Sequence, residues 1–361
     1  PISFQFSMAG DKGLDGAGSV DSVNAQTGAV VLEADDINTT ALGTFGGDDV
    51  EFVLDDHDAR VTTLEADIVS LTATAIANTP AGGVSAMTVQ AAINELDADK
   101  VGITAIREKL TADRTYYVRA DGSDSNDGLA NASGGAFLTK QKAINVVAAL
   151  DISIYNVTIQ VEDGTYSGGV NVNAPWIGSG EVTLQGNLTT PANCVISVTS
   201  ANCILVTNYG RLRVRGFKVQ TTTSGIGVAA QNGGVLSVVG NMDYGACATA
   251  HIYAERTGVL GITASYTISG NAPCHMQALS HAYIFNFVTT VTLSGTRAFS
   301  TAFAKCDRMA LMEFSGNTFT GSATGTRYTV TSGAGINTFG GGATYLPGSG
   351  AGAATSPGWY A

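Results

Sequence analysis

Charged residues, prolines and long apolar runs are all scarce in this sequence of 361 residues. Only 13% of the side chains are charged and only 7 residues are proline. No stretch approaches 18 consecutive apolar residues, and the first residues lack the charged-then-apolar pattern of a secretion signal, so we expect neither a membrane span nor such a signal. The 45 glycines, without a three-residue period and with 44% hydrophobic residues, exclude collagen, argue against disorder and favour many short strands.

Basic side chains are too few for phosphate neutralisation. Residues 1–156 hold 23 acidic and 9 basic side chains, whereas residues 157–361 hold 7 acidic and 9 basic ones. The net charge of −12 and the nearly uncharged second half argue against nucleic acid as a partner.

Cysteine is also sparse, with five residues, an odd number, and no CxxC pair. We expect small buried hydrophobic residues in a reducing compartment, in preference to a disulfide framework or a metal site. The five are Cys194, Cys203, Cys247, Cys274 and Cys306.

Apolar residues between Val50 and Ala75 are spaced alternately four and three apart, which predicts a short coiled coil. A second helix is expected over Met87–Asp99. Isoleucine alternating with leucine along the seam favours three strands, and His57 at a core position is expected to fix register, with an axial metal or anion site as the alternative. The predicted interface residues are Leu54, His57, Val61, Leu64, Ile68 and Leu71.

From about Tyr116 onward, strand-like segments repeat at a period of 24 residues. Leu212, Leu236, Leu260 and Ile284 form one set, and Ile204, Val228, Ile252 and Met276 form a second. A looser third set comprises Val219, Tyr244, Ile268, Leu293 and Phe319. Three short strands per repeat predict a mainly β chain with a right-handed parallel β-helix, capped by an amphipathic helix within Phe137–Leu150.

Several segments resemble the fibre and spike proteins of tailed bacterial viruses. Tyr116–Val147 and Val161–Tyr166 are similar to the initial segment of pectate-lyase-like β-helices. Val23–Thr39 resembles a motif near the N-termini of phage fibres, and Ile336–Gly348 resembles their C-terminal tails. The resemblance implies a homotrimer on the exterior of a virion, anchored by its N-terminus with its β-helix pointing towards the cell surface.

These features together divide the chain into five regions. We expect a virion-anchoring segment over 1–46, where Val30, Val31 and Leu32 dock to a capsid or tail protein. The other expected regions are a coiled coil and helical neck over 47–112, a β-helix cap over 113–156, a right-handed β-helix over 157–335 and a glycine-rich tail over 336–361.

Three interpretations of function are compatible with the sequence. The first is attachment to the bacterial host by binding surface polysaccharide without cleaving it. The second is a polysaccharide depolymerase of the same fold, either a lyase or a glycosidase, and the third is a purely structural capsid or tail decoration. We expect no cofactor.

Outward-facing apolar residues on one predicted face suit packing of three β-helices about an axis, or else a platform for stacking sugars. They include Tyr283, Phe285 and Phe287. Nearby, Arg211, Arg213 and Arg215 alternate with buried positions, so this ridge would hold acidic polysaccharide or pair with acidic residues of a neighbouring subunit.

A second face is predicted to present titratable residues outwards. If Ile252 and Met276 point inward, His251 and His275 should point outward and stack about 4.8 Å apart. The pair could then contact a ligand, act as an acid and a base, or be ordinary polar residues on the surface. The full set on this face is His251, Tyr253, Glu255, His275 and Gln277.

Paired carboxyl groups are missing from the repeat. No two of its acidic residues lie one repeat apart or two apart on a strand, whereas a glycosidase needs two carboxyls about 5 to 9.5 Å apart. The acidic segment Asp121–Gly128 departs from the EF-hand spacing, so we expect a capped turn there and no metal site.

Overall fold

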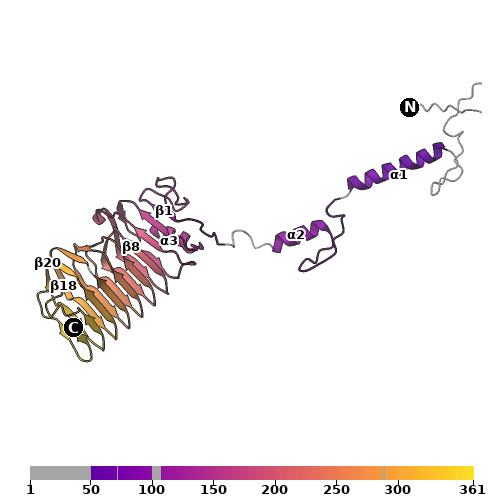
Figure 1. Ribbon diagram of the computed structural model, residues 1–361. Coiled ribbons are helices and arrows are strands. Elements are labelled where there is room, and N and C mark those ends of the chain that lie inside the picture. The colour runs from indigo at the N-terminus through magenta and orange to yellow at the C-terminus, as the bar shows by residue number, and fades with distance from the viewer. Residues whose placement is uncertain (1–49, 71, 100–106, 288) are drawn as a thin grey trace, which may run out of the picture. The chain divides into compact units, whose positions relative to one another are not determined.

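The computed structural model describes residues 50–70, 72–99, 107–287 and 289–361. The chain divides into two units between residues 103 and 104, and each is described by itself. The first unit is helical and the second is a stack of strands (Figure 1). Val30, Val31, Leu32 and Leu71 lie outside the described residues.

Two helices form the described part of the first unit, as predicted. Helix α1 spans Val50–Ser70 and α2 spans Val89–Asp99. The Thr88 hydroxyl accepts a hydrogen bond from the Ala91 amide at 3.2 Å and so caps α2. Within the described ranges, neither these helices nor any other is long and apolar enough to cross a membrane.

The predicted seam of α1 is exposed to solvent in the single chain. Leu54 and Leu64 are each 59% exposed, and Ile68 is 67% exposed. Val61 is 40% exposed and His57 is exposed. An apolar stripe of this kind requires a partner helix to be buried, so the coiled coil remains a prediction.

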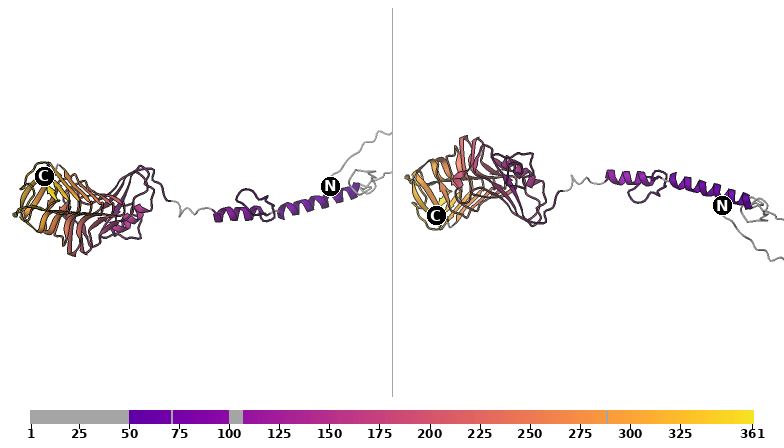
Figure 2. Two further views of the ribbon diagram at one scale, coloured as in Figure 1. Left: turned by 90° about the horizontal axis from the view of Figure 1, so that it is seen from below. Right: turned by 90° about the horizontal axis from the view of Figure 1, so that it is seen from above.

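The second unit contains one sheet of ten parallel strands that runs the length of the stack (Figure 2). Each strand comes from a successive turn of the chain, so the sheet grows by one strand per turn. In order these strands are β1 Arg114–Val118, β2 Val157–Val161, β5 Val182–Gln185, β8 Arg211–Arg215, β11 Val235–Val238, β14 Val259–Ile262, β17 Tyr283–Phe287, β19 Leu311–Ser315, β22 Gly335–Asn337 and β24 Trp359–Tyr360.

A second sheet of 14 strands bends around the other sides of the stack. One array contains β3 Gly164–Tyr166, β6 Cys194–Ser200, β9 Lys218–Ser224, β12 Asp243–Tyr244, β15 Tyr266–Ile268 and β20 Thr318–Gly325. The other contains β4 Val170–Val172, β7 Ile204–Val206, β10 Ile226–Gln231, β13 Ala250–Glu255, β16 Ala272–Leu279, β21 Tyr328–Val330 and β23 Ala353–Ala354. The 18-residue strand β18, Thr290–Asp307, pairs with β15 and β16 and so joins the arrays. The predicted parallel β-solenoid is confirmed.

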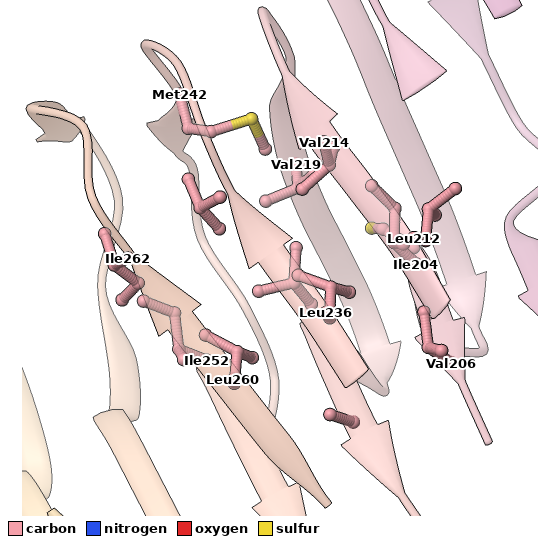
Figure 3. Packing of buried hydrophobic residues seen from close by; sticks show 14 of the residues in the cluster. Ile204, Val206, Leu212, Val214, Val219, Leu236, Met242, Ile252, Leu260 and Ile262 are labelled. Carbon is pink, nitrogen blue, oxygen red and sulfur yellow. The ribbon is translucent and has the colours of Figure 1, made fainter. Parts of the chain in front are cut away.

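The 24-residue period is confirmed by the strand register. Leu236 pairs with Leu212 and Leu260, and Val228 pairs with Ile204 and Ile252. Aliphatic side chains from successive turns meet in the interior, as Figure 3 shows for Leu212, Leu236 and Leu260. The third set differs at its end, because Phe319 pairs with Val291 and not with Leu293.

The predicted cap helix is α3, which spans Lys140–Ala148 and packs against β1, β2 and β4. Ala143, Ile144 and Val147 form its buried face. The stacked strands extend beyond both predicted boundaries of the β-helix, because β1 pairs with β2 and β24 pairs with β22.

All five cysteines are buried and free, as predicted. Burial raises the pKa of Cys194, Cys203, Cys247 and Cys306 to about 12. These thiols therefore behave as small apolar side chains in the core.

Candidate functional site

His251 and His275 do not face outwards, and the prediction that they contact a ligand on the surface is wrong. Both are fully buried, and their Nδ1 atoms are 3.1 Å apart. The predicted stacking one turn apart is therefore right, but it takes place inside the solenoid.

The orientation was mispredicted because strict alternation fails at the bend between the two strand arrays. His251 and Ile252 are adjacent in β13, yet both are fully buried and lie among residues of the solenoid core, so alternation fails between them. One turn later the pairing of β16 with β18 shifts register between Ala272 and Cys274. Such irregularities let consecutive side chains point the same way.

A chain of hydrogen bonds leads from the histidine pair to the far side of the interior. The Thr289 hydroxyl donates to Asn286 Oδ1 at 2.8 Å, and Asn286 Nδ2 donates to the Tyr266 hydroxyl at 3.2 Å. The Tyr266 oxygen lies 2.8 Å from His275 Nε2. Because Asn286 donates to Tyr266, the tyrosine proton is available for His275 Nε2. The network thus assigns the His275 proton to Nδ1, where it faces His251 Nδ1.

Desolvation keeps both imidazoles uncharged at neutral pH. It lowers the pKa of His251 to about 3 and holds the pKa of His275 well below the usual value. His251 Nε2 has no hydrogen-bond partner among the described residues. Aromatic rings enclose the pair, including Tyr244 and Phe303, whose centroids lie 5.8 Å from His251 and 4.8 Å from His275, respectively. The pair is a structural element of the core.

Tyr253, Glu255 and Gln277 lie on the outer side of the same strands, as predicted. Tyr253 is only 9% exposed because it packs with an apolar cluster of outer residues. The Glu255 carboxylate lies 4.0 Å from Arg256 Nε. The cluster contains Ile226, Ala229, Tyr253 and Leu279, with Leu205 beside it. This face is therefore more apolar than the sequence suggested.

The three arginines of β8 point outwards while Leu212 and Val214 are buried, as predicted. Each guanidinium already has a partner in its own chain. Arg213 forms an ion pair with Glu181, Arg215 Nε donates to Gln185 Oε1 at 2.6 Å, and Arg211 Nη2 donates to the Gly178 carbonyl at 3.3 Å. Arg211 is the exposed member of the ridge.

Aromatic side chains line the same outer surface several turns later. The ring centroids of Tyr283 and Phe285 are 5.4 Å apart, and those of Phe285 and Phe287 are 5.2 Å apart. The Tyr283 hydroxyl donates to Glu313. Together with the half-exposed aliphatic residues beside them, these residues form what we call the apolar strip: Val235, Val259, Tyr283, Phe285, Phe287 and Leu311.

The acidic residues of the solenoid bind neutral or basic partners. Asp243 Oδ2 lies 3.3 Å from Lys218 Nζ. The Asp163 carboxylate accepts a hydrogen bond from Asn187, and the Glu162 carboxylate accepts one from Asn131. The Thr331 hydroxyl donates to Asp307, which lowers its pKa, the opposite of what a general acid needs. Within the described ranges, no three His, Cys, Asp or Glu side chains gather closely enough to hold a metal ion.

The acidic segment before α3 forms the capped turn that was predicted. Asp127 Oδ1 accepts from the Leu129 amide at 2.9 Å. Asp124 accepts from the amides of Leu138 and Thr139 and from the Thr139 hydroxyl. Asp124 thereby fixes the start of α3.

Sequence reasoning missed Lys140, the first residue of α3. It is 2% exposed, and its Nζ lies 4.4 Å from the centroid of the Tyr166 ring. It also lines a cavity of about 370 Å³ beside the helix. The signal was available in the sequence, because Lys140 lies four residues before Ile144 and thus on the buried face of the predicted helix.

No protein-family model, curated protein or solved structure matches this chain.

Proposed function

We propose that the chain is a fibre or spike protein on the exterior of a phage or phage-like virion. It forms a homotrimer and attaches the particle to its bacterial host by binding surface polysaccharide without cleaving it. The β-solenoid is consistent with the family resemblance of the sequence, and the shortage of paired carboxyls favours binding over cleavage.

The observation that carries this proposal is the exposure of apolar surface in both units. The seam of α1 and the apolar strip of the solenoid each leave large apolar side chains accessible to solvent. Isolated monomers rarely expose such contiguous surfaces. Two further copies of the same chain are the occupants that satisfy both, with three seams forming the coiled coil and three strips packing against one another between the solenoids.

We further propose that the solenoid is right-handed. Its strands are parallel within each sheet and each turn returns to the same sheet through a crossover. Crossover connections between parallel strands are right-handed in nearly all proteins.

Analytical ultracentrifugation of the full chain tests the architecture. A species of three times the 36.8 kDa chain mass is expected, and Phe285→Asp should weaken it in dilution because it places a carboxylate in the strip. Phe339→Asp is the matched control, since Phe339 is 59% exposed outside the strip. A monomeric wild type contradicts the proposal.

Adsorption and cleavage assays test the function. Purified protein should bind host cells and compete with particles for adsorption. It should release no new reducing ends or unsaturated sugars from host capsule or lipopolysaccharide, since such products would instead identify a depolymerase. If particles that lack the protein still adsorb normally, the protein is not needed for attachment and a purely structural decoration is favoured.

Docking to the virion is assigned to residues 1–46. A truncation beginning near Gly47 should keep its trimeric mass and its cell binding but fail to join particles. A truncated chain that still assembles into virions would place the anchor elsewhere.

A further inference from the structure

The cavity at the start of α3 has a positively charged residue in its wall. Lys140 and Tyr166 are both almost completely buried, at 2% and 6% exposure, yet both line this cavity of about 370 Å³. The volume lies within the range of ordinary small-ligand sites.

The Lys140 ammonium has no anionic partner among the described residues. Its Nζ lies 4.4 Å from the centroid of the Tyr166 ring. Cys194 and Cys203 are also near it, but burial raises the pKa of both thiols to about 12, so they stay neutral. Desolvation lowers the pKa of Lys140 to about 8. An unpaired buried charge is destabilising, and an anion would relieve it.

The backbone around Lys140 also favours an anion. Asp124 accepts hydrogen bonds from the amides of Leu138 and Thr139, whereas the amides of Lys140 and Gln141 have no acceptor among the described residues. These amides belong to the first turn of a nine-residue helix, where the helix dipole attracts negative charge.

The rest of the wall is suited to a sugar. Thr165 and Ser167 line the cavity and are exposed, so their hydroxyls can bond to sugar hydroxyls. Gly168 forms part of the wall, and a Cβ added there would meet no atom within 4 Å. The open space beside Gly168 is therefore available to a ligand.

We propose that this cavity binds the carboxylate of an acidic sugar, with the Lys140 ammonium as its counterion and the first amides of α3 as hydrogen-bond donors. The proposal rests on the proposed binding of surface polysaccharide and names the kind of residue recognised. A carboxylate is favoured over a phosphate monoester because one ammonium matches one negative charge.

Titration calorimetry of the full chain with sodium glucuronate, glucose and inorganic phosphate tests this site. Lys140→Met removes the charge but keeps an unbranched side chain in the core, and Gly168→Leu fills the cavity while leaving the charge. The matched controls are Lys142→Met, two residues along the same helix, and Gly134→Leu, where an added Cβ also meets no atom within 4 Å.

Wild type should bind glucuronate and not glucose, and both site variants should weaken this binding about ten-fold or more. Both controls should bind like wild type, and circular dichroism should show all four variants folded. If Lys140→Met fails to fold, Gly168→Leu decides alone. The proposal is overturned if wild type binds glucose as well as glucuronate, or binds phosphate more tightly. It is also overturned if Gly168→Leu, or a folded Lys140→Met, binds glucuronate as tightly as wild type.

Cell adsorption separates this site from the attachment function. Protein that adsorbs to host cells but binds no glucuronate overturns the site and leaves attachment standing. Protein that binds glucuronate through Lys140 but adsorbs to no bacterium supports the site and contradicts attachment.

Discussion

The two units of this chain bury apolar side chains in different ways. In the solenoid, Leu236 and Leu260 are fully buried between turns of one chain. In α1, Leu54 and Leu64 are each more than half exposed. The solenoid therefore has a hydrophobic core within one chain, whereas α1 has an apolar face that only a partner helix would bury.

This difference implies that the two units depend differently on assembly. Each turn of a solenoid is stabilised by the turns on either side of it. Most of the stability of a helix in a protein comes from packing its apolar face, and the apolar face of α1 is exposed in one chain. We infer that the solenoid folds within one chain and that the helices become stable only with further copies.

Separating the units should produce the largest effect. A fragment of residues 107–361 should give a β-type circular dichroism spectrum and a cooperative melt at any concentration. A fragment of residues 47–106 should be largely unfolded when dilute and gain helix as its concentration rises, because association supplies the missing face. Circular dichroism over a dilution series measures both fragments. If the helix content of the 47–106 fragment did not change with concentration, the helical unit would not depend on assembly and the contrast between the units would be wrong.

The pH dependence of stability should follow the buried histidines of the solenoid. In the unfolded chain, imidazoles bind protons below about pH 6.5, whereas His251 in the folded chain does so only near pH 3. Protons therefore favour the unfolded state between these values, and the free energy of unfolding should fall by on the order of 5 kcal/mol from His251 alone as the pH is lowered across this window. The loss should be absent above about pH 6.5.

Denaturant titrations of the fragment 107–361 at several pH values measure this loss. The double variant His251→Leu, His275→Leu should flatten the dependence, even if its stability at neutral pH is lower. His281→Asn replaces an exposed histidine in a turn and should leave the dependence unchanged. An unchanged slope in the double variant would show that other groups cause the loss.

Equivalent leucine truncations in the two units sharpen the comparison further. Leu236→Ala removes a side chain that is 0% exposed and should lower the unfolding free energy of the solenoid by about 3 kcal/mol. Leu64→Ala should leave that transition unchanged and instead raise the concentration at which the helical fragment associates. Urea melts and ultracentrifugation separate the two results, and a solenoid destabilised by Leu64→Ala would contradict the division.

The fold was largely predictable because the period of the repeat fixes the register in which successive strands pair. Leu212, Leu236 and Leu260 are each spaced by one turn, and parallel pairing then fixes which residues are neighbours. The histidines were placed one turn apart correctly for the same reason. The direction in which the two histidines point was mispredicted. Alternation of side chains between the two faces holds only within a straight strand, and His251 lies where the sheet bends.

The candidate site was less predictable for a different reason. The cavity beside α3 is formed by the start of the helix, a turn at Ala120, strand β3 and the loop that follows it, and no local pattern brings Lys140 next to Tyr166. The helical period was a signal that Lys140 lies on the buried face, but it does not identify what surrounds the ammonium. Its lack of an acidic partner depends on the side chains around it, which the sequence does not specify.

The smallest predicted effect concerns the two-residue turns of the solenoid, whose residues adopt a left-handed conformation. Gly233 has a φ of 74° in one turn of the stack, and Thr257 occupies the same place in the next with a φ of 60°. This conformation is strained for a residue with a branched Cβ but open to glycine.

Thr257→Gly should therefore raise the unfolding free energy by about 0.5 kcal/mol, the strain relieved less the entropy that glycine loses on folding. The Thr257 hydroxyl donates to the Arg256 carbonyl at 2.6 Å, so Thr257→Ala controls for that bond while keeping a Cβ. Thermal melts of the fragment 107–361 should rank Thr257→Gly above Thr257→Ala. The reverse order would mean that the neighbouring turns hold this backbone without strain, and the solenoid would then be more tolerant of sequence at its bends than its core suggests.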